Sequence, residues 1–315
     1  MDILLVSLFQ FFCGLLTLFI ASNALLASAD KAIVRFHLPP LFIGSTLIAI
    51  GTSLPEICVS FQSVYMGEPD VAFANIIGSN LVNASFVLGV CMFLQTIPFS
   101  KNLFLKQLLP NCFITLIVLI AVWSGGILSR VAGFVLVTFF IVYLHFCYKH
   151  KAKDESKASK HFFKPTIFNI MMLFLVSLPL FYFGSRFVTI GALEIANQLS
   201  INSAFVGFTL IAFGTSLPEF ITGVLAALRK QNNFVIGNVF GSNLCNMGLG
   251  LGLVALWMPL KSNDCIYLRK ELSFLLMLSA LLCCCAKLRH WGKLLGTLLA
   301  GLYMVVIYML YAMKA

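Results

Sequence analysis

Long apolar runs, separated by short polar or turn-forming breaks, occupy most of the chain. The runs are apolar on all sides and show neither the alternation of a barrel strand nor the single stripe of a surface helix. Because a segment within hydrocarbon must satisfy its own backbone hydrogen bonds, each run is expected to form a helix. The pattern predicts ten transmembrane segments, at 3–27, 41–64, 73–96, 104–122, 127–148, 165–192, 204–227, 234–257, 270–286 and 291–311.

The composition excludes a soluble protein of this length. Hydrophobic residues make up 60% of the 315 residues and charged residues 10%, against roughly 45–50% and about 25% in soluble domains. The mean hydropathy is +1.00. At roughly 20 apolar residues per span, the chain has room for about ten helices with short connections. We therefore predict an all-α integral membrane protein.

The formal net charge of +10 raises the question of a nucleic-acid partner, and the positions of the charges answer it. With the N-terminus outside, the inner connections carry 15 Lys and Arg residues and the outer ones carry 5, which leaves Arg186 inside a span. This bias follows the positive-inside rule. The sequence thus predicts a multi-pass protein of the cell membrane (the inner membrane), in contact with lipids and without a nucleic-acid partner. Both termini are predicted outside, and the basic connector 149–164 is predicted to be cytoplasmic.

Two blocks of sequence occur twice at the same separation. Residues 44–56 (GSTLIAIGTSLPE) and 207–219 (GFTLIAFGTSLPE) agree at eleven of thirteen positions, with an offset of 163 residues. At that offset, 75–89 (NIIGSNLVNASFVLG) and 238–252 (NVFGSNLCNMGLGLG) agree at eight of fifteen positions. Equal spacing across both blocks indicates one duplicated unit.

The duplication divides the chain into a first five-helix repeat at 1–148, the connector at 149–164 and a second five-helix repeat at 165–315. Since five is odd, the second copy would enter the membrane upside down relative to the first. The predicted fold is therefore ten transmembrane helices in two inverted five-helix repeats. Secondary transporters are built in this way, with their binding site near the midplane between the repeats.

Of the eleven acidic residues, Glu56 and Glu219 lie deep inside predicted spans, at equivalent positions of the two copies. An ionised carboxylate at the bilayer centre costs at least ~2.5–3.5 kcal/mol and usually marks a binding site or ion pathway. The structural alternative is a buried pair with Lys or Arg. Arg186 is the one candidate, and the predicted span places it near the outer end of its helix. The two glutamates are therefore expected to be functional.

A helix break is predicted directly before each glutamate. Pro55 cannot donate a backbone hydrogen bond and clashes with the carbonyl of Gly51, so carbonyls near Ala49 and Gly51 are expected to leave the helical ladder. Such backbone is tolerated at membrane depth where it lines a cavity. The hydroxyls three and four residues before each glutamate share its helical face. They belong to Thr52 and Ser53 in the first copy and to Thr215 and Ser216 in the second.

The second block adds hydroxyl and amide side chains spaced four residues apart, which we expect to bind ions: Ser79 with Asn83, and Ser242 with Asn246. Gly78 and Gly241 are instead expected to serve close helix packing. Carboxylate, carbonyl, hydroxyl and amide oxygens suit hard cations such as Ca²⁺, Na⁺, Mg²⁺ or Mn²⁺. Two carboxylates balance one divalent ion or two monovalent ions. Competition for one set of oxygens is the simplest basis for antiport.

The ten cysteines and five histidines add no second chemistry. The cysteines lie mostly in apolar runs without the spacing of metal ligands, and the histidines lie near span ends. A hydrolase that used Ser53 or Ser216 would lack an activating base. No resident cofactor and no enzymatic activity are therefore predicted. A cation channel that uses the same carboxylates, or a non-transporting membrane scaffold, would be the alternative to an antiporter.

On the doubled GTSLPE and GSNxxN motifs, the chain resembles the calcium/cation antiporter superfamily, specifically the sodium/calcium exchanger type without a large regulatory loop. The resemblance covers the whole length. It implies exchange of cytoplasmic Ca²⁺ for external Na⁺, with the first and sixth helices sliding against the other eight. The ion-coordinating positions that it implies are Ala49, Thr52, Ser53, Glu56, Ser79, Asn83, Ala212, Thr215, Ser216, Glu219, Ser242 and Asn246.

One position departs from the family pattern. Several calcium-transporting relatives carry an acid where this chain has Asn246, and the proton-coupled branch tends to place Glu where Asn83 and Asn246 stand. The pattern therefore favours sodium coupling and leaves open an H⁺-coupled antiporter or one for another divalent cation. The preferred divalent ion, the stoichiometry, the direction of transport in the cell and the oligomeric state also stay open at this point.

Overall fold

A computed structural model of the chain describes residues 2–36, 49–98, 104–123, 125–149, 166–262, 265–285 and 290–312. The described chain is almost entirely helical. The helices up to Lys149 are α1 (Asp2–Phe36), α3 (Leu54–Tyr65), α4 (Pro69–Leu81), η1 (Val82–Val87), α5 (Leu88–Leu94), η2 (Phe104–Leu108), α7 (Leu109–Trp123) and α8 (Arg130–Lys149). Those that follow are α9 (Ile167–Gln198), α10 (Ser203–Val206), η3 (Gly207–Ile211), α11 (Ala212–Thr215), α12 (Leu217–Leu228), α13 (Asn232–Cys245), η4 (Asn246–Leu251), α14 (Gly252–Trp257), α15 (Cys265–Cys285) and α16 (Lys293–Ala312).

Six helical segments of the described chain are long and apolar enough to cross a membrane, and the bent pair 203–215 and 217–228 would make a seventh. A shorter apolar helix covers Lys293–Met309. Together with the helical architecture, these segments make the chain an all-helical membrane protein. Of the predicted segments, residues 41–48 lie outside the described residues, as does the connector 149–164 apart from Lys149.

Two helices continue past the ends of their predicted membrane segments, although the apolar span within α1, Ile3–Leu25, agrees with the predicted segment. Helix α1 continues to Phe36 and α9 to Gln198, beyond the predicted ends at 27 and 192. The added residues include Ala, Lys, Glu and Gln, which favour the helix in polar surroundings, so loss of hydrophobicity does not end it. Arg186 consequently lies twelve residues before the end of α9 rather than near it, and its side chain is exposed.

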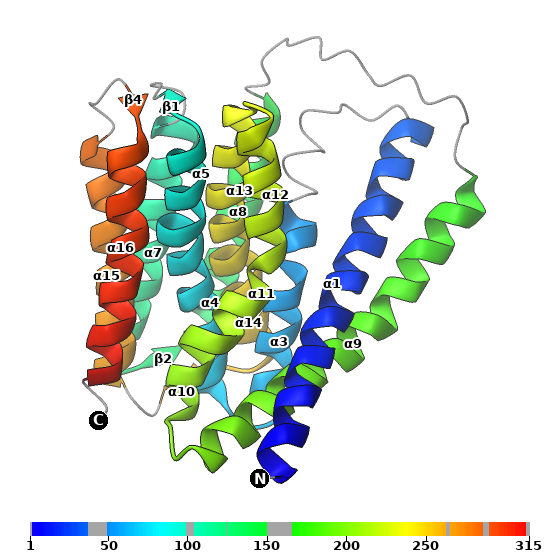
Figure 1. The fold of residues 1–315 in the computed structure, drawn as a ribbon, viewed down its shortest axis with the longest axis vertical. Helices are drawn as coiled ribbons and strands as arrows, with labels where there is room; N and C mark the ends of the chain where they lie inside the picture. The colour runs from blue at the N-terminus through cyan, green and yellow to red at the C-terminus, as the bar shows by residue number, and fades with distance from the viewer. Residues whose placement is uncertain are drawn as a thin grey trace.

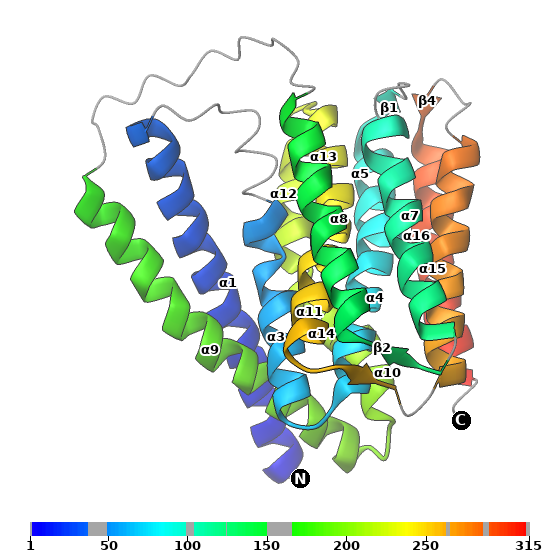
Figure 2. The same ribbon diagram turned by 180° about the vertical axis from the view of Figure 1, so that it is seen from behind.

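Helices α1 and α9 lie together at one edge of the molecule and are inclined relative to the remaining bundle (Figures 1 and 2). Glycines bring their backbones close. A Cβ at Gly14 would lie 2.6 Å from the backbone N of Val188, and one at Gly191 would lie 2.8 Å from the backbone N of Phe11. The pair also shares an apolar cluster, which includes Phe11, Leu18 and Val188 and continues into the neighbouring bundle at Val59 and Val71. The two helices therefore form one tightly packed unit.

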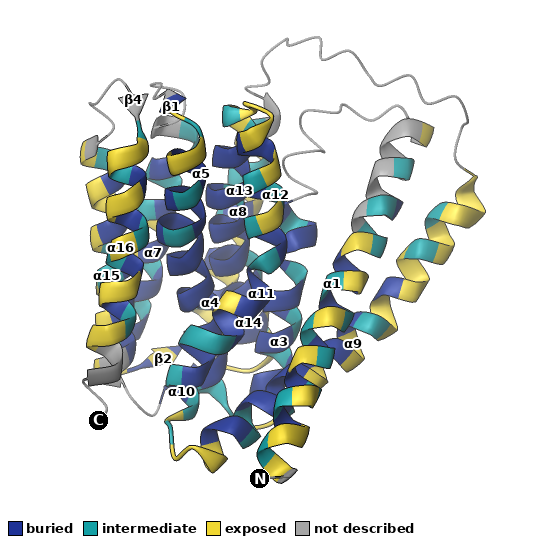
Figure 3. Ribbon diagram, in the orientation of Figure 1, coloured by how far each residue is buried: buried dark blue, intermediate teal, exposed yellow. Residues whose placement is uncertain are grey.

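The remaining helices form a bundle with a separate and larger apolar core. Its central helices, α4, α5, α13 and α14, are buried along much of their length, whereas α15 and α16 expose an outer face (Figure 3). Helix packing within this bundle is close, since a Cβ at Gly78 of α4 would lie 2.6 Å from the carbonyl oxygen of Phe208 in η3. The packing role predicted for Gly78 is confirmed.

Two short antiparallel strand pairs lie at opposite ends of the molecule (Figure 1). Strand β1 (Ile97–Pro98) pairs with β4 (His290–Trp291), and β2 (Ile127–Leu128) pairs with β3 (Leu260–Lys261). Adding 163 to the residue numbers of β1 gives β3, and adding it to those of β2 gives β4. The spacing of the sequence repeat thus also relates the two strand pairs. Helix α1 begins, and α16 ends, at the end of the molecule that carries β2 and β3 (Figure 1).

Candidate functional site

The helix breaks predicted before the two glutamates are present. Ser53 and Ser216 interrupt their helices. The backbone angles are φ −83° and ψ −3° at Ser53, and φ −80° and ψ 4° at Ser216. The segments on either side of Ser216 meet at 44°. Pro55 and Pro218 lie in the first turn of the helices that follow, where a missing N–H removes no helical bond.

The carbonyls at Ala49 and Ala212 correct one expectation. Each still accepts the backbone N–H four residues later, from Ser53 and Ser216, at 3.1 Å. The hydroxyl of Thr52 adds a second hydrogen bond to the carbonyl of Ala49, at 3.3 Å. The ladder therefore persists at these two carbonyls, because Ser53 and Ser216 still donate their backbone N–H groups although the helix is interrupted there. A carbonyl oxygen has two acceptor positions, so these bonds do not exhaust it.

Each glutamate accepts a hydrogen bond from the serine of the opposite helix break. Ser53 Oγ donates to Glu219 Oε1 at 3.3 Å, and Ser216 Oγ donates to Glu56 Oε1 at 3.1 Å. All four side chains are fully buried. Because each serine lies three residues before the glutamate of its own copy, the crossed bonds bring the two carboxylates close together. The structure thus brings the two acidic positions into one buried site between the two helix breaks.

The second block contributes to this site from α4 and α13. Ser79 Oγ donates to the carbonyl of Ala212 at 3.4 Å, and the hydroxyls of Thr52 and Ser242 lie 3.4 Å apart. Asn83 and Asn246 lie in η1 and η4, where the helix widens to a π-helix. Such local widening is rare and is found frequently at functional sites. All twelve predicted site residues are buried.

Asn75 and Asn238 were not predicted as site residues. The amide Nδ2 of each donates to the backbone carbonyl of a glutamate at 2.9 Å, Asn75 to Glu56 and Asn238 to Glu219. Asn75 also contacts the opposite copy, because Thr215 Oγ1 donates to its Oδ1 at 3.4 Å. Both asparagines stand at the first position of the repeated second block, so their identity in the two copies was the signal that could have found them.

A reciprocal asparagine pair joins α4 to α13. The side chain of Asn80 donates to the carbonyl of Asn243, and the side chain of Asn243 donates to the carbonyl of Asn80, each at 3.0 Å. The two copies differ three residues later, at Asn83 and Asn246. Asn246 Nδ2 donates to Asn80 Oδ1 at 3.0 Å, whereas neither polar atom of the Asn83 side chain has a hydrogen-bond partner.

Several oxygens in the site have no hydrogen-bond partner although they are buried. They include Glu56 Oε2, Glu219 Oε2, Asn83 Oδ1 and Asn246 Oδ1. Buried polar atoms are normally satisfied, since an unmade hydrogen bond costs about 1–3 kcal/mol. Within the described ranges, no group of three or more His, Cys, Asp or Glu side chains is placed to hold a metal ion. Chemically, the site offers carboxylate, hydroxyl and amide oxygens to a hard cation.

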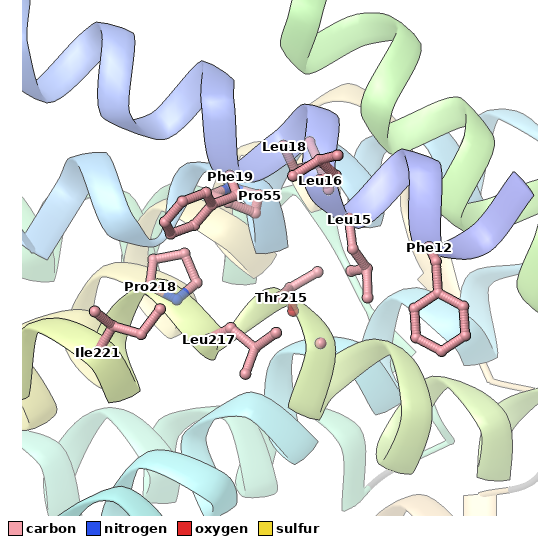
Figure 4. Close-up of a pocket in the computed structure, with 11 residues that line it drawn as sticks. Phe12, Leu15, Leu16, Leu18, Phe19, Pro55, Thr215, Leu217, Pro218 and Ile221 are labelled. Atoms are coloured by element: carbon pink, nitrogen blue, oxygen red, sulfur yellow. The ribbon is translucent and has the colours of Figure 1, made fainter. Parts of the chain in front are cut away.

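An apolar pocket of about 310 Å³ separates α1 from the two helix breaks. It is lined by Phe12, Leu15 and Leu16 of α1 on one side and by Pro55, Leu217 and Pro218 on the other (Figure 4). Gly214 lies close to α1, since a Cβ there would be 2.8 Å from a methyl carbon of Leu15. The contact between α1 and the breaks is therefore apolar and non-directional.

Comparison with known proteins places the chain among membrane transporters. The model of the sodium/calcium exchanger protein family matches twice, at residues 6–149 and 169–312. An uncharacterized membrane protein of Methanocaldococcus jannaschii is 33% identical over 94% of this chain and 95% of its own length. The inner membrane protein YrbG of Escherichia coli is 30% identical over 95% and 94%. The sodium/calcium exchanger MaX1 of Methanosarcina acetivorans is 24% identical over 78% and 82%.

Solved structures of the sodium-calcium exchanger NCX_Mj resemble this one. The structure soaked with 2.5 mM Na⁺ and 0.1 mM Ca²⁺ is 31% identical to this chain, with a TM-score of 0.69 over 96% of this chain and 98% of that one. The family consists of exchangers rather than enzymes, and its transported ions are Na⁺ and Ca²⁺. The two family matches, the full-length relatives and the doubled buried glutamates agree, so this chain belongs to the sodium/calcium exchanger protein family.

Proposed function

We propose that this protein is a secondary antiporter that exchanges Na⁺ for Ca²⁺ by alternating access at one midplane site. The observation that carries the proposal is the crossed pair of hydrogen bonds, Ser53 to Glu219 and Ser216 to Glu56, around carboxylate oxygens without partners. Carbonyl and hydroxyl oxygens of Ala49, Ala212 and Thr215, together with Ser79, Asn83, Ser242 and Asn246, would complete the ligand set.

The proposed architecture is ten spans in two inverted five-helix repeats. Three features support it: the repeated sequence blocks, the two strand pairs that share their 163-residue offset, and the positions of these pairs at opposite ends of the molecule. We further propose that both termini lie outside the cell membrane. The 15 to 5 distribution of Lys and Arg supports this orientation, as does the shared end of α1 and α16.

Alternating access requires one part of the protein to move as a body past the other. The α1–α9 pair suits this role, because its two helices approach within backbone contact and so can move as one body. The apolar pocket between α1 and the helix breaks offers few directional bonds that would have to be broken during sliding. We propose that this pair slides and thereby exposes the site to each side in turn.

Charge explains why the two ions would take turns. Two carboxylates without a cation leave a charge of −2 in a buried site, which resists crossing because an unpaired buried charge is costly. One Ca²⁺ or two Na⁺ would neutralise it. The loaded forms would therefore cross, and the empty form would not, which couples the two fluxes.

The experiment is Ca²⁺ flux in proteoliposomes under an imposed Na⁺ gradient. We expect an inward Na⁺ gradient to expel Ca²⁺, and Glu56→Gln or Glu219→Gln to abolish the flux. Glu194→Gln, on the end of α9, is the matched control and should retain it. Flux driven by a proton gradient and not by Na⁺ would replace the sodium assignment with H⁺ coupling. Flux that persists without any counter-ion would indicate a channel, and full activity of either glutamate variant would refute the site.

A further inference from the structure

Two cysteine thiols from distant parts of the chain lie in contact within the bundle, away from the ion site. The Sγ atoms of Cys112 in α7 and Cys283 in α15 are 3.5 Å apart, although 171 residues separate them in the sequence. Both side chains are half-buried, so a small reagent can reach them. The fold therefore creates a pair of thiols that the spacing of the cysteines did not indicate.

Helices α7 and α15 run antiparallel side by side, and a polar contact joins them near each end (Figures 1 and 2). Near the end that carries β2 and β3, Arg269 Nη2 donates to the carbonyl of Trp123 at 2.7 Å, and the guanidinium lies over the Trp123 ring. Near the end that carries β1 and β4, the contact is that between the thiols of Cys112 and Cys283, which are weak donors and acceptors. The thiol end is therefore the more weakly fixed of the two.

A bond at the thiols would attach α15 to the centre of the bundle. Helix α7 is tied to the buried helix α13 right beside Cys112, because Asn111 Nδ2 donates to the carbonyl of Phe240 at 3.1 Å. Helix α15, by contrast, exposes its outer face (Figure 3). A covalent link between α7 and α15 would thus extend this anchorage to a peripheral helix.

The geometry favours a disulfide over a bound metal ion. A disulfide has an S–S length of about 2.05 Å, so the sulfurs would approach by about 1.5 Å, which rotation of the two side chains can supply. The product is neutral and suits apolar surroundings. Two thiolates around Cu⁺ would instead leave a net negative charge there. Within the part of the chain that the structure describes, no third His, Cys, Asp or Glu joins the pair.

We propose that Cys112 and Cys283 form an oxidisable dithiol, which a peroxide converts to a disulfide that joins α15 to α7. One thiol sulfur attacks a peroxide oxygen, the O–O bond breaks, and a sulfenic acid and one water form. The second thiol sulfur attacks the sulfenic sulfur, the S–O bond breaks, and the S–S bond and a second water form. The two sulfurs thereby lose two electrons, which reduce one hydrogen peroxide to two waters.

The disulfide is expected to be reversible and to leave ion exchange running. In the orientation proposed above, the thiols lie towards the cytoplasmic side, where thiol reductants would restore them after an oxidative episode. The link closes a long loop of chain, which restricts the unfolded state and stabilises the folded one. Both helices belong to the bundle rather than to the α1–α9 pair, so the link does not join the parts proposed to slide.

The test is treatment of the purified full chain with hydrogen peroxide, followed by alkylation of the remaining thiols and peptide mass spectrometry. We expect a linked peptide pair that contains Cys112 and Cys283 and disappears after reduction. The melting temperature should rise by several degrees on oxidation and return on reduction. Cys112→Ser and Cys283→Ser should each lose both the link and the rise. Cys284→Ser is the matched control and should keep both, since its exposed side chain is the next one along α15.

Separate alkylation of Cys112 and Cys283 after peroxide treatment would overturn the proposal, and so would a link made through Cys284. Oxidised protein in proteoliposomes should keep its Na⁺-dependent Ca²⁺ flux. A loss of flux on oxidation that Cys112→Ser escapes would overturn the assignment of the link to the static bundle. The linked peptide and the melting temperature require no ion flux, so failure of the proposed exchange would leave the test of the thiols intact.

Discussion

At the scale of single residues, amide side chains hold the two glutamates in position. Asn75 and Asn238 bind the glutamate backbone carbonyls, and the reciprocal pair of Asn80 and Asn243 joins the helices behind them. Asn75 and Asn238 each join two consecutive helices, whereas the Asn80–Asn243 pair joins α4 to α13, which lie far apart in the sequence. A buried hydrogen bond of this kind fixes geometry, because breaking it leaves a polar group unsatisfied. The site is therefore organised by residues that need not contact the ion.

The asymmetry of the asparagine pair predicts unequal costs of mutation. Asn80→Ala removes two hydrogen bonds, because the Asn80 side chain donates to the carbonyl of Asn243 and accepts from the amide of Asn246. Asn243→Ala removes only the hydrogen bond that its amide donates, because Asn243 Oδ1 has no partner. We expect Asn80→Ala to destabilise the protein more, by about 1–3 kcal/mol for each buried group left unsatisfied. Thermal unfolding of the purified protein measures this difference. Asn197→Ala, at an exposed position, is the control and should change stability by less than about 0.5 kcal/mol. Equal losses of stability in Asn80→Ala and Asn243→Ala would contradict the unequal hydrogen bonding.

The crossed serine contacts predict matched losses of ion affinity. Ser53→Ala and Ser216→Ala each remove the hydroxyl that contacts the glutamate of the opposite break. A hydrogen bond to a charged group is worth about 1.5–3 kcal/mol, so each variant should weaken Ca²⁺ binding about 10- to 100-fold. Calcium titration of detergent-purified protein gives the affinities. Ser63→Ala is the control, since its buried hydroxyl bonds to its own helix at Val59. A loss in one serine variant alone would argue against a shared site.

The glutamates could be predicted from the sequence, whereas their supporting amides could not. A carboxylate in an apolar run is costly wherever it points, so its presence alone indicates function. An asparagine can ligate an ion, bind a backbone carbonyl or join two helices, and the sequence does not distinguish these roles. Asn75 and Asn83 stand in the same repeated block, yet one binds the carbonyl of Glu56 and the other has no partner. That difference depends on which helices lie opposite, which is a property of the fold.

At the scale of helices, local chemistry predicts where a helix breaks but not how its neighbours respond. Pro55 and Pro218 correctly indicated the two interruptions, because a missing N–H acts within one turn. The carbonyls of Ala49 and Ala212 stay bonded, however, and the π-helices at Asn83 and Asn246 have no distinct signal in the sequence. Both features depend on the packing of the surrounding helices rather than on local propensity.

The close approach of α1 and α9 predicts that small residues there are essential. Gly14→Ala would place a Cβ 2.6 Å from the backbone N of Val188, which requires the two helices to move apart. We expect a loss of about 1–3 kcal/mol in stability, as for other overpacked sites, together with slower exchange. Thermal unfolding and Ca²⁺ flux measure the two effects. Gly301→Ala on α16 has no atom within 4 Å of the added Cβ and should leave both unchanged. Wild-type behaviour of Gly14→Ala would contradict the packing.

At the scale of the whole molecule, the 163-residue offset appears in the sequence blocks, the helix breaks, the glutamate contacts and the strand pairs. The offset was visible in the sequence because the site residues are nearly identical in both copies. The strand pairs were not, since two-residue strands at the ends of apolar helices carry no distinct pattern. Their pairing joins segments more than 130 residues apart.

A single shared site predicts that Na⁺ and Ca²⁺ stabilise the protein without adding to each other. A ligand that binds the folded state at about 100 times its Kd raises the free energy of unfolding by about 2.7 kcal/mol. Suppose both ions bind at the single site of Glu56 and Glu219. A second ion of equal stabilising effect then adds about 0.4 kcal/mol, because it only doubles the population of ion-bound protein relative to the unfolded state.

Melting temperatures measured with each ion alone and with both distinguish the cases, and Glu219→Gln should weaken both responses while Glu194→Gln keeps them. Independent sites would instead give about 5.4 kcal/mol together, and that sum would contradict competition. Because antiport requires that the two ions exclude each other from the same carboxylates, non-additive stabilisation is the equilibrium counterpart of coupled flux.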